Sequence, residues 1–218
     1  MLRVIATGRS LFSARKVIPA NFPIDYLIFS SGAGIMDWGE QKLLQNHFMK
    51  KAEVETVFKV LTARGLDFMV HKPIPDNHHF VYFQTGIKNP DFAERCELYK
   101  SFATSGNNIA FTISEACQFL VIEPHSIWIE IFPRNVSKSS AGARIAGAHR
   151  IKRHKILAIG NDYNDLDLLK WAAMSFVVST SPGELKDLFP VISSENESDF
   201  TEAVSIWKRR HWAHGDSS

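Results

Sequence analysis

Short apolar runs that alternate with amphipathic stretches are the feature that most restricts the fold of this chain. Near the amino terminus, apolar runs at residues 2–6 and 26–29 flank a helix-like stretch at residues 10–18. The alternation returns later, with apolar runs at residues 156–159, 176–178 and 191–192 and a helical pattern at residues 166–173. Short apolar runs joined by helices are typical of parallel strands. Both ends of the chain are therefore predicted to form one α/β domain with a Rossmann-like parallel sheet.

The middle of the chain has a different pattern. Helix-like and strand-like segments follow one another at residues 53–64, 68–71, 80–84, 90–102, 119–122 and 127–132. This order predicts an inserted α+β module at residues 37–133, within a core made of residues 1–36 and 134–218. Glycine and proline at residues 32–34 and 133–135 are typical of hinges between two such modules.

Composition and charge exclude several classes of protein. The chain has 218 residues, 45% of them hydrophobic, and a formal net charge of +2 with both signs interspersed. No basic surface for nucleic acid and no apolar run long enough for a membrane span are expected. Cys96 and Cys117 have no metal-ligand spacing and fit reduced thiols. We expect a soluble cytoplasmic protein that has neither nucleic-acid nor membrane partners.

An acidic loop follows the apolar run at residues 156–159. It places Asp162, Asp165 and Asp167 within six residues of sequence, where the carboxylates repel one another unless water, a cation or hydrogen bonds offset the charge. A calcium-binding EF-hand loop is excluded, because Asp167 and Ala173 stand where that loop needs glycine and glutamate. A cation site at the carboxyl end of a strand is one interpretation.

A purely structural interpretation of the loop stays open. Asn161 or Asp162 could turn the chain, and Asn164 or Asp165 could cap the helix that begins near Leu166. These roles account for two of the acidic positions but not for all of them.

Two further polar features lie next to predicted elements. Thr7-Gly8-Arg9 follows the first strand, where it could hold an anion or simply turn the chain into a helix capped by Thr7 or Ser10. Lys138 opens a helix-like stretch at residues 139–148. A helix start does not favour an ammonium group, so a nearby anion would explain this lysine, whereas the alternative is an ordinary solvated side chain.

In this order, three motifs resemble the second, third and fourth signature motifs of the haloacid dehalogenase-like hydrolases. They are Ala6-Thr-Gly-Arg-Ser10, Val136-Ser-Lys138 and Ile159-Gly-Asn-Asp-Tyr-Asn-Asp165. The resemblance is closest to the Cof-type sugar-phosphatase branch, in which an α+β cap lies between the second and third motifs. It implies that residues 37–133 are such a cap.

The resemblance also implies a reaction and a set of site residues. The reaction is magnesium-dependent hydrolysis of a small phosphorylated metabolite, a sugar phosphate above all, through an aspartyl-phosphate. Thr7 and Lys138 would be catalytic, and Thr7, Gly8 and Lys138 would bind phosphate. Arg9 and Asn164 would support the site or contact the cap. The metal ligands would be Asn161, Asp162 and Asp165.

Substrate choice would depend on cap loops. Asp76, Asn77, His78 and His79 have polar side chains that could bind sugar hydroxyls, and a solvated turn is the alternative. The segment Ser30–Gly34 could approach the substrate or serve as a hinge.

Two departures from the family pattern bear on activity. Asn161 stands where the fourth motif usually has its first aspartate, and the first motif, aspartate-x-aspartate followed by glycine-threonine, is absent from the 218 residues. We expect that Met1 is an internal methionine of a longer protein, that the central first strand is missing, and that this form is inactive. The alternatives are a catalytically dead protein that binds phosphate or a sugar phosphate, and an α/β interaction domain without a small-molecule site.

Overall fold

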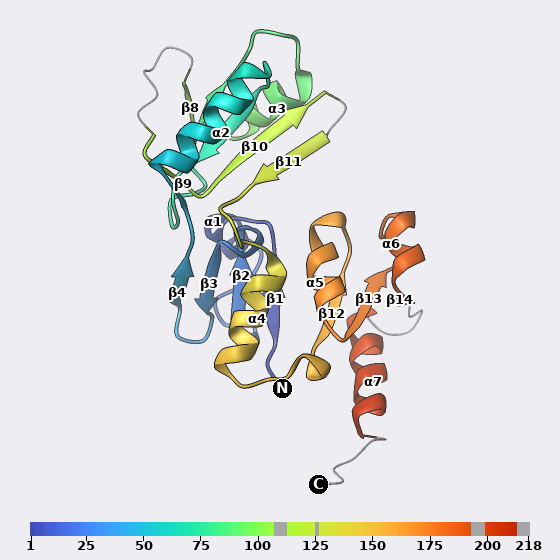
Figure 1. Cartoon of the computed structure of the whole chain (residues 1–218). Helices are drawn as coiled ribbons and strands as arrows, with labels where there is room; N and C mark the ends of the chain where they lie inside the picture. The colour runs from blue at the N-terminus through green and yellow to red at the C-terminus, as the bar shows by residue number, and fades with distance from the viewer. Residues whose placement is uncertain (107–112, 125–126, 193–198, 213–218) are drawn as a thin grey trace. The chain divides into compact units, whose positions relative to one another are not determined.

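The chain folds into two compact units, Met1–Val136 and Ser137–Ser218 (Figure 1). A computed structural model describes residues 1–106, 113–124, 127–192 and 199–212. Helices and strands alternate in both units, and each unit contains parallel strand pairs. The predicted mixed α/β class with parallel pairing is confirmed.

The first sheet of the amino-terminal unit has the strand order β1-β2-β3-β4. Its strands are β1 (Val4–Ala6), β2 (Tyr26–Phe29), β3 (Gly34–Asp37) and β4 (Lys42–Asn46). Strands β1 and β2 are parallel, and α1 (Leu11–Arg15) connects them. A 3-10 turn, η1 (Ser30–Gly32), reverses the chain so that β3 and β4 continue the sheet in antiparallel fashion. Segment 32–34 was predicted to be a hinge, yet here the chain stays in the sheet as far as Asn46.

The second sheet of this unit has five strands in the order β11-β10-β6-β7-β8. They are β6 (Phe68–His71), β7 (Phe80–Phe83), β8 (Ala103–Ser105), β10 (Gln118–Glu123) and β11 (Ile127–Ile131). Alternate residues of β6 belong to two apolar clusters, which also contain residues of α2 (Lys51–Ala63) and α3 (Pro90–Leu98) respectively. A short pair, β5 (Met49–Lys50) with β9 (Glu115–Ala116), completes the strands. The alternation of strands and helices predicted for this region is therefore present, although α3 ends earlier than expected.

The carboxyl-terminal unit contains a parallel sheet with the order β12-β13-β14. Its strands are β12 (Leu157–Gly160), β13 (Met174–Val178) and β14 (Val191–Ile192), and its helices are α4 (Lys138–Ala148), α5 (Leu166–Trp171), α6 (Gly183–Leu188) and α7 (Asp199–Trp212). Short 3-10 turns, η2 (Arg153–Lys155) and η3 (Tyr163–Asp165), precede β12 and α5. Apolar side chains of α5, α6 and α7 bury the sheet in two clusters. All three strands predicted for this end of the chain form.

Each unit has a first strand with only one neighbour. Among the described residues, β1 is the outer strand of its sheet, and β12 is the outer strand of the other. The missing central strand stays a prediction, as does the division into a core of residues 1–36 and 134–218 and an inserted module of residues 37–133. No helix within the described part of the chain is long and apolar enough to cross a membrane.

Candidate functional site

The acidic loop of the carboxyl-terminal unit folds tightly over the end of β12. Gly160 closes the strand, and Asp165 packs directly over it, so that a Cβ atom at position 160 would lie 2.7 Å from Cβ of Asp165. Contacts this short do not occur between real side chains, which explains why a glycine stands here. The backbone N–H of Asn161 donates to Oδ2 of Asp165 over 3.0 Å. The turn from strand to helix is thus built around one buried carboxylate.

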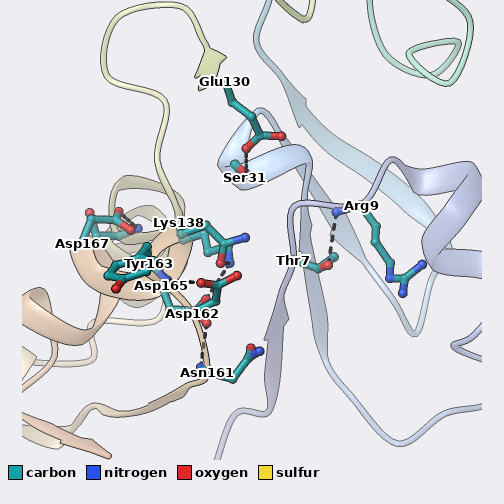
Figure 2. A network of polar contacts seen from close by, with 12 residues as sticks. Thr7, Arg9, Ser31, Glu130, Lys138, Asn161, Asp162, Tyr163, Asp165 and Asp167 are labelled. Carbon is teal, nitrogen blue, oxygen red and sulfur yellow. Dashed lines mark hydrogen bonds and ion pairs between the residues drawn. The ribbon is translucent and has the colours of Figure 1, made fainter. Parts of the chain in front are cut away.

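Lys138 meets this carboxylate in a buried ion pair (Figure 2). Its Nζ lies 2.6 Å from Oδ1 of Asp165, and the two side chains are only 3% and 8% exposed. The ammonium also donates to Oδ1 of Asn164 over 2.8 Å. Ser137 caps α4 and places Lys138 in the first turn, where the helix dipole disfavours a positive charge. The anion that offsets this charge here is the carboxylate of Asp165.

The three aspartates of the loop have separate hydrogen-bond donors. Asp162 accepts from the backbone N–H of Tyr163 over 2.7 Å, and Asp167 accepts from the backbone N–H of Ser139 at the start of α4 over 2.8 Å. Together with the pair formed by Asp165, these bonds offset the repulsion between the carboxylates. Within the described ranges, no three His, Cys, Asp or Glu side chains gather closely enough to hold a metal ion. The metal ligands predicted from the sequence stay a prediction.

Sequence reasoning did not identify one contact of the acidic loop. The hydroxyl of Tyr163 donates to Oε2 of Glu184 in α6 over 2.7 Å, although both side chains are exposed. This hydrogen bond raises the pKa of Tyr163 above its ordinary value. The pKa of Glu184 is lowered, mainly by a hydrogen bond from its own backbone and further by the hydroxyl of Tyr163. No sequence signal links a tyrosine and a glutamate that lie this far apart in the chain.

In the amino-terminal unit, the Thr7–Arg9 loop and the η1 turn are joined by backbone hydrogen bonds. The N–H groups of Ser30 and Ser31 donate to the carbonyl oxygens of Arg9 and Thr7 over 2.8 and 3.0 Å. The hydroxyl of Thr7 accepts from the N–H of Arg9 over 3.2 Å, and Ser10 is the cap of α1. Arg9 itself is exposed, and its guanidinium donates to Ser13. Both segments follow the carboxyl ends of parallel strands, which is the usual location of ligand sites in such sheets.

Glu130 of β11 extends to the same turn (Figure 2). Its Oε2 lies 3.3 Å from the hydroxyl of Ser31, which donates to it. The sequence marked Ser30–Gly34 as a segment that could approach a substrate, but it contained no signal for Glu130, because the two positions are 99 residues apart.

The loop of residues 76–79, which was predicted to bind sugar hydroxyls, contains one buried residue. Asn77 is 4% exposed, and its amide donates to the hydroxyl of Ser30 over 2.7 Å. The backbone carbonyl oxygen of Asn77 accepts from Nδ1 of His71, and burial lowers the pKa of His71 to about 4. His78 stacks on Phe12 with ring centroids 4.3 Å apart. Asn77 and His78 thus have structural contacts, and so has His79, whose ring packs against Phe102; Asp76 is exposed. Their binding roles stay predictions.

Neither cysteine has the properties of a nucleophile. Burial raises the pKa of Cys117 to about 12 and that of Cys96 to about 11. A thiol must lose its proton to attack, so both are inert near neutral pH. This agrees with their interpretation as reduced structural thiols.

Comparisons with known proteins place the chain in a family. The family profile of the haloacid dehalogenase-like hydrolases matches residues 1–200. A protein from Mycoplasma pneumoniae, provisionally named a phosphatase, is 22% identical, and the match covers 93% of this chain and 83% of that protein.

Two solved structures share the fold at low sequence identity. A phosphatase of the haloalkanoate (HAD) superfamily from Bacteroides thetaiotaomicron superposes with a TM-score of 0.71 at 15% identity, covering 94% of this chain and 81% of that one. The HAD subclass IIB sugar phosphatase BT4131 superposes with a TM-score of 0.66, also at 15% identity, covering 95% and 84%. The order of three signature motifs predicted this membership, and the profile match confirms it: the chain belongs to the haloacid dehalogenase-like hydrolases.

Proposed function

We propose that this chain provides the phosphate-handling part of a phosphatase for a small phosphorylated metabolite, a sugar phosphate above all. The observation that carries the proposal is the buried pair of Lys138 and Asp165, with Asn164 as a second acceptor. A buried ion pair seldom adds net stability over apolar residues, so its presence needs another reason. A lysine held in one position is suited to offset the charge of a transferring phosphoryl group.

The other signature residues have matching roles in this proposal. The hydroxyl of Thr7 and the backbone amide of Gly8 would donate to phosphate oxygens. The hydroxyl of Thr7 accepts a hydrogen bond from the N–H of Arg9, so its own proton is available to donate to a phosphate oxygen. Arg9, exposed beside this loop, would contact the substrate or the cap. We also propose that residues 37–133 form the cap and that the protein acts in the cytoplasm.

The cation proposed for the acidic loop is magnesium. Asn161 and Asp162 have exposed side chains with oxygen donors, which magnesium prefers. Asp165 would also lie near the ion, although its two oxygens already accept from Lys138 and the Asn161 amide. When bound, magnesium would neutralise charge on the phosphoryl oxygens. Water or oxygen atoms outside this loop would occupy the remaining coordination positions.

Hydrolysis in this family needs an aspartate nucleophile, and the 218 residues contain no aspartate-x-aspartate followed by glycine-threonine. A strand that ends in this motif could pair with β1 or β12, each of which has one neighbouring strand among the described residues. The contacts among these residues fit ligand binding, and turnover would need the nucleophile that such a strand carries. A second candidate function is a protein that binds a sugar phosphate without turning it over, which would need only the contacts described above.

Turnover separates the two candidates. The chain alone, and the chain preceded by the segment encoded upstream of Met1, are assayed with magnesium and a panel of phosphate esters. We expect hydrolysis by the longer form alone. A longer form that binds the esters without hydrolysing them would support the binding protein instead, and an upstream frame without an aspartate-x-aspartate strand would contradict the phosphatase proposal.

A further inference from the structure

We propose that Ser31 and Glu130 form a subsite for a hydroxyl group on the leaving group of the phosphate ester. This inference rests on the proposed function and extends it, because it assigns the two side chains that would favour a polyhydroxylated substrate over a plain alkyl or aryl phosphate.

The backbone of the η1 turn is held in an unusual conformation. Ser30 and Ser31 have φ angles of 49° and 52°, in the left-handed region that non-glycine residues seldom adopt. Two such residues in succession store strain, and they persist only when surrounding contacts hold them in place. The contacts here are the bonds from Ser30 and Ser31 to the Thr7–Arg9 loop and the bond from Asn77 to the hydroxyl of Ser30. The turn is thus fixed with the hydroxyl of Ser31 directed toward Glu130.

The turn lies beside the loop to which we assign phosphate binding. The N–H of Ser31 donates to the carbonyl oxygen of Thr7 over 3.0 Å, so one hydrogen bond separates Ser31 from the proposed phosphate-binding residue. A group attached to a phosphate held by Thr7 would therefore be close to Ser31. Thr7, Ser31 and Glu130 all belong to the amino-terminal unit.

Glu130 and Ser31 have the chemistry to bind a hydroxyl and to reject a phosphate. Glu130 is exposed on β11, and an ionised carboxylate only accepts hydrogen bonds. The dianion of a phosphate ester has no proton to donate and carries the same sign of charge as Glu130, so it is disfavoured next to this carboxylate. A sugar hydroxyl that inserts between the two side chains can donate to Glu130 and accept the proton that Ser31 now donates to Glu130, so it replaces that hydrogen bond with two. The pair therefore fits the leaving group and not the phosphoryl group.

The contact could instead be only a structural link between β11 and the η1 turn. The two interpretations differ in what the variants do to ligand preference. A structural link affects all ligands alike or changes only stability, whereas a subsite affects only those ligands that carry the hydroxyl.

Ligand-observed NMR titration of the 218-residue chain tests the inference with three ligands: orthophosphate, hexyl phosphate and a six-carbon polyol phosphate. We expect the polyol phosphate to bind about tenfold to a hundredfold more tightly than hexyl phosphate, the range for a hydrogen bond to a charged group. Glu130→Ala and Ser31→Gly should each remove most of this preference and leave orthophosphate binding within about twofold. Glycine suits the left-handed backbone of residue 31, so this variant removes the hydroxyl without adding strain.

Glu123→Ala is the matched control, because it removes a carboxylate at the other end of the β10–β11 hairpin. It should leave the preference unchanged. Equal affinity of the wild-type chain for the polyol and hexyl phosphates, or a preference that survives in both variants, would overturn the subsite while the phosphate site stands. A wild-type chain that binds none of the three ligands would overturn the phosphate-binding function and the subsite together.

Discussion

Replacing Asp165 by alanine should destabilise the carboxyl-terminal unit strongly. The substitution leaves the ammonium of Lys138 buried, with a side chain only 3% exposed and no carboxylate beside it. Breaking a buried pair by removing one partner costs about 3–5 kcal/mol, because the remaining charge is desolvated without compensation. The substitution also removes Oδ2 of Asp165, the acceptor of the hydrogen bond from the N–H of Asn161.

Hydrogen exchange measured by mass spectrometry is the suitable assay, since it reports on α4 and α5 separately from the other unit. Exchange of the protected amides in these helices should become faster by about two to three and a half powers of ten. The double variant Lys138→Met with Asp165→Ala removes both charges and should recover part of this loss.

The pair of Lys100 and Glu97 provides a matched control. Its Nζ–Oε1 distance is also 2.6 Å, but its side chains are 74% and 73% exposed. Glu97→Ala should leave exchange in its own helix unchanged, because water replaces the lost partner. If Asp165→Ala were as harmless as Glu97→Ala, the argument that burial makes the Lys138–Asp165 pair indispensable would be wrong.

Three further predictions concern single positions. Burial lowers the pKa of His71 to about 4, so the unfolded chain takes up a proton at higher pH than the folded chain. The free energy of unfolding therefore keeps its full value above pH 6.5 and falls by about 3 kcal/mol as the pH drops to 4. Urea unfolding at pH 7 and pH 5 measures this effect: between these pH values, His71→Gln should lose less free energy of unfolding than wild type. An equal loss in both proteins would contradict the prediction. Gly160→Ala should destabilise the unit by about 1–3 kcal/mol through the clash with Asp165, as measured by exchange of α5 amides; wild-type exchange would refute the clash. Ser31→Asn should preserve or raise the melting temperature, because asparagine tolerates the left-handed backbone at φ 52°, whereas Ser31→Val should lower it; equal melting temperatures would contradict the strain argument.

Much of the strand pattern could be predicted because buried strands are continuous apolar runs. Tyr26–Phe29 and Phe68–His71 form as predicted, and both are almost wholly buried. Strand β4 was not predicted, since most of Lys42–Asn46 is exposed and polar residues flank its two leucines. An antiparallel strand as exposed as β4 has no run of buried apolar residues to mark it.

The site was predictable in its residues but not in its contacts. The order of the motifs identified Thr7, Lys138 and the acidic loop, because each follows a strand or begins a helix. The sequence could not reveal that Lys138 is buried or that Asp165 is its partner, since a lysine is usually solvated and the two residues are far apart in the chain. It also could not reveal that Asp162, Asp165 and Asp167 each accept from a different donor. The assignment of Asn161, Asp162 and Asp165 as metal ligands stays a prediction.

Binding of orthophosphate to the 218-residue chain, measured by isothermal titration calorimetry, tests the central claim most directly. That claim is that Thr7 and Lys138 handle a phosphoryl group. The account predicts that wild type binds and that Thr7→Val and Lys138→Met each weaken binding by about tenfold or more, the contribution of a hydrogen bond to a charged group. Glu97→Ala should bind like wild type. Orthophosphate affinity that neither Thr7→Val nor Lys138→Met reduces would contradict the account.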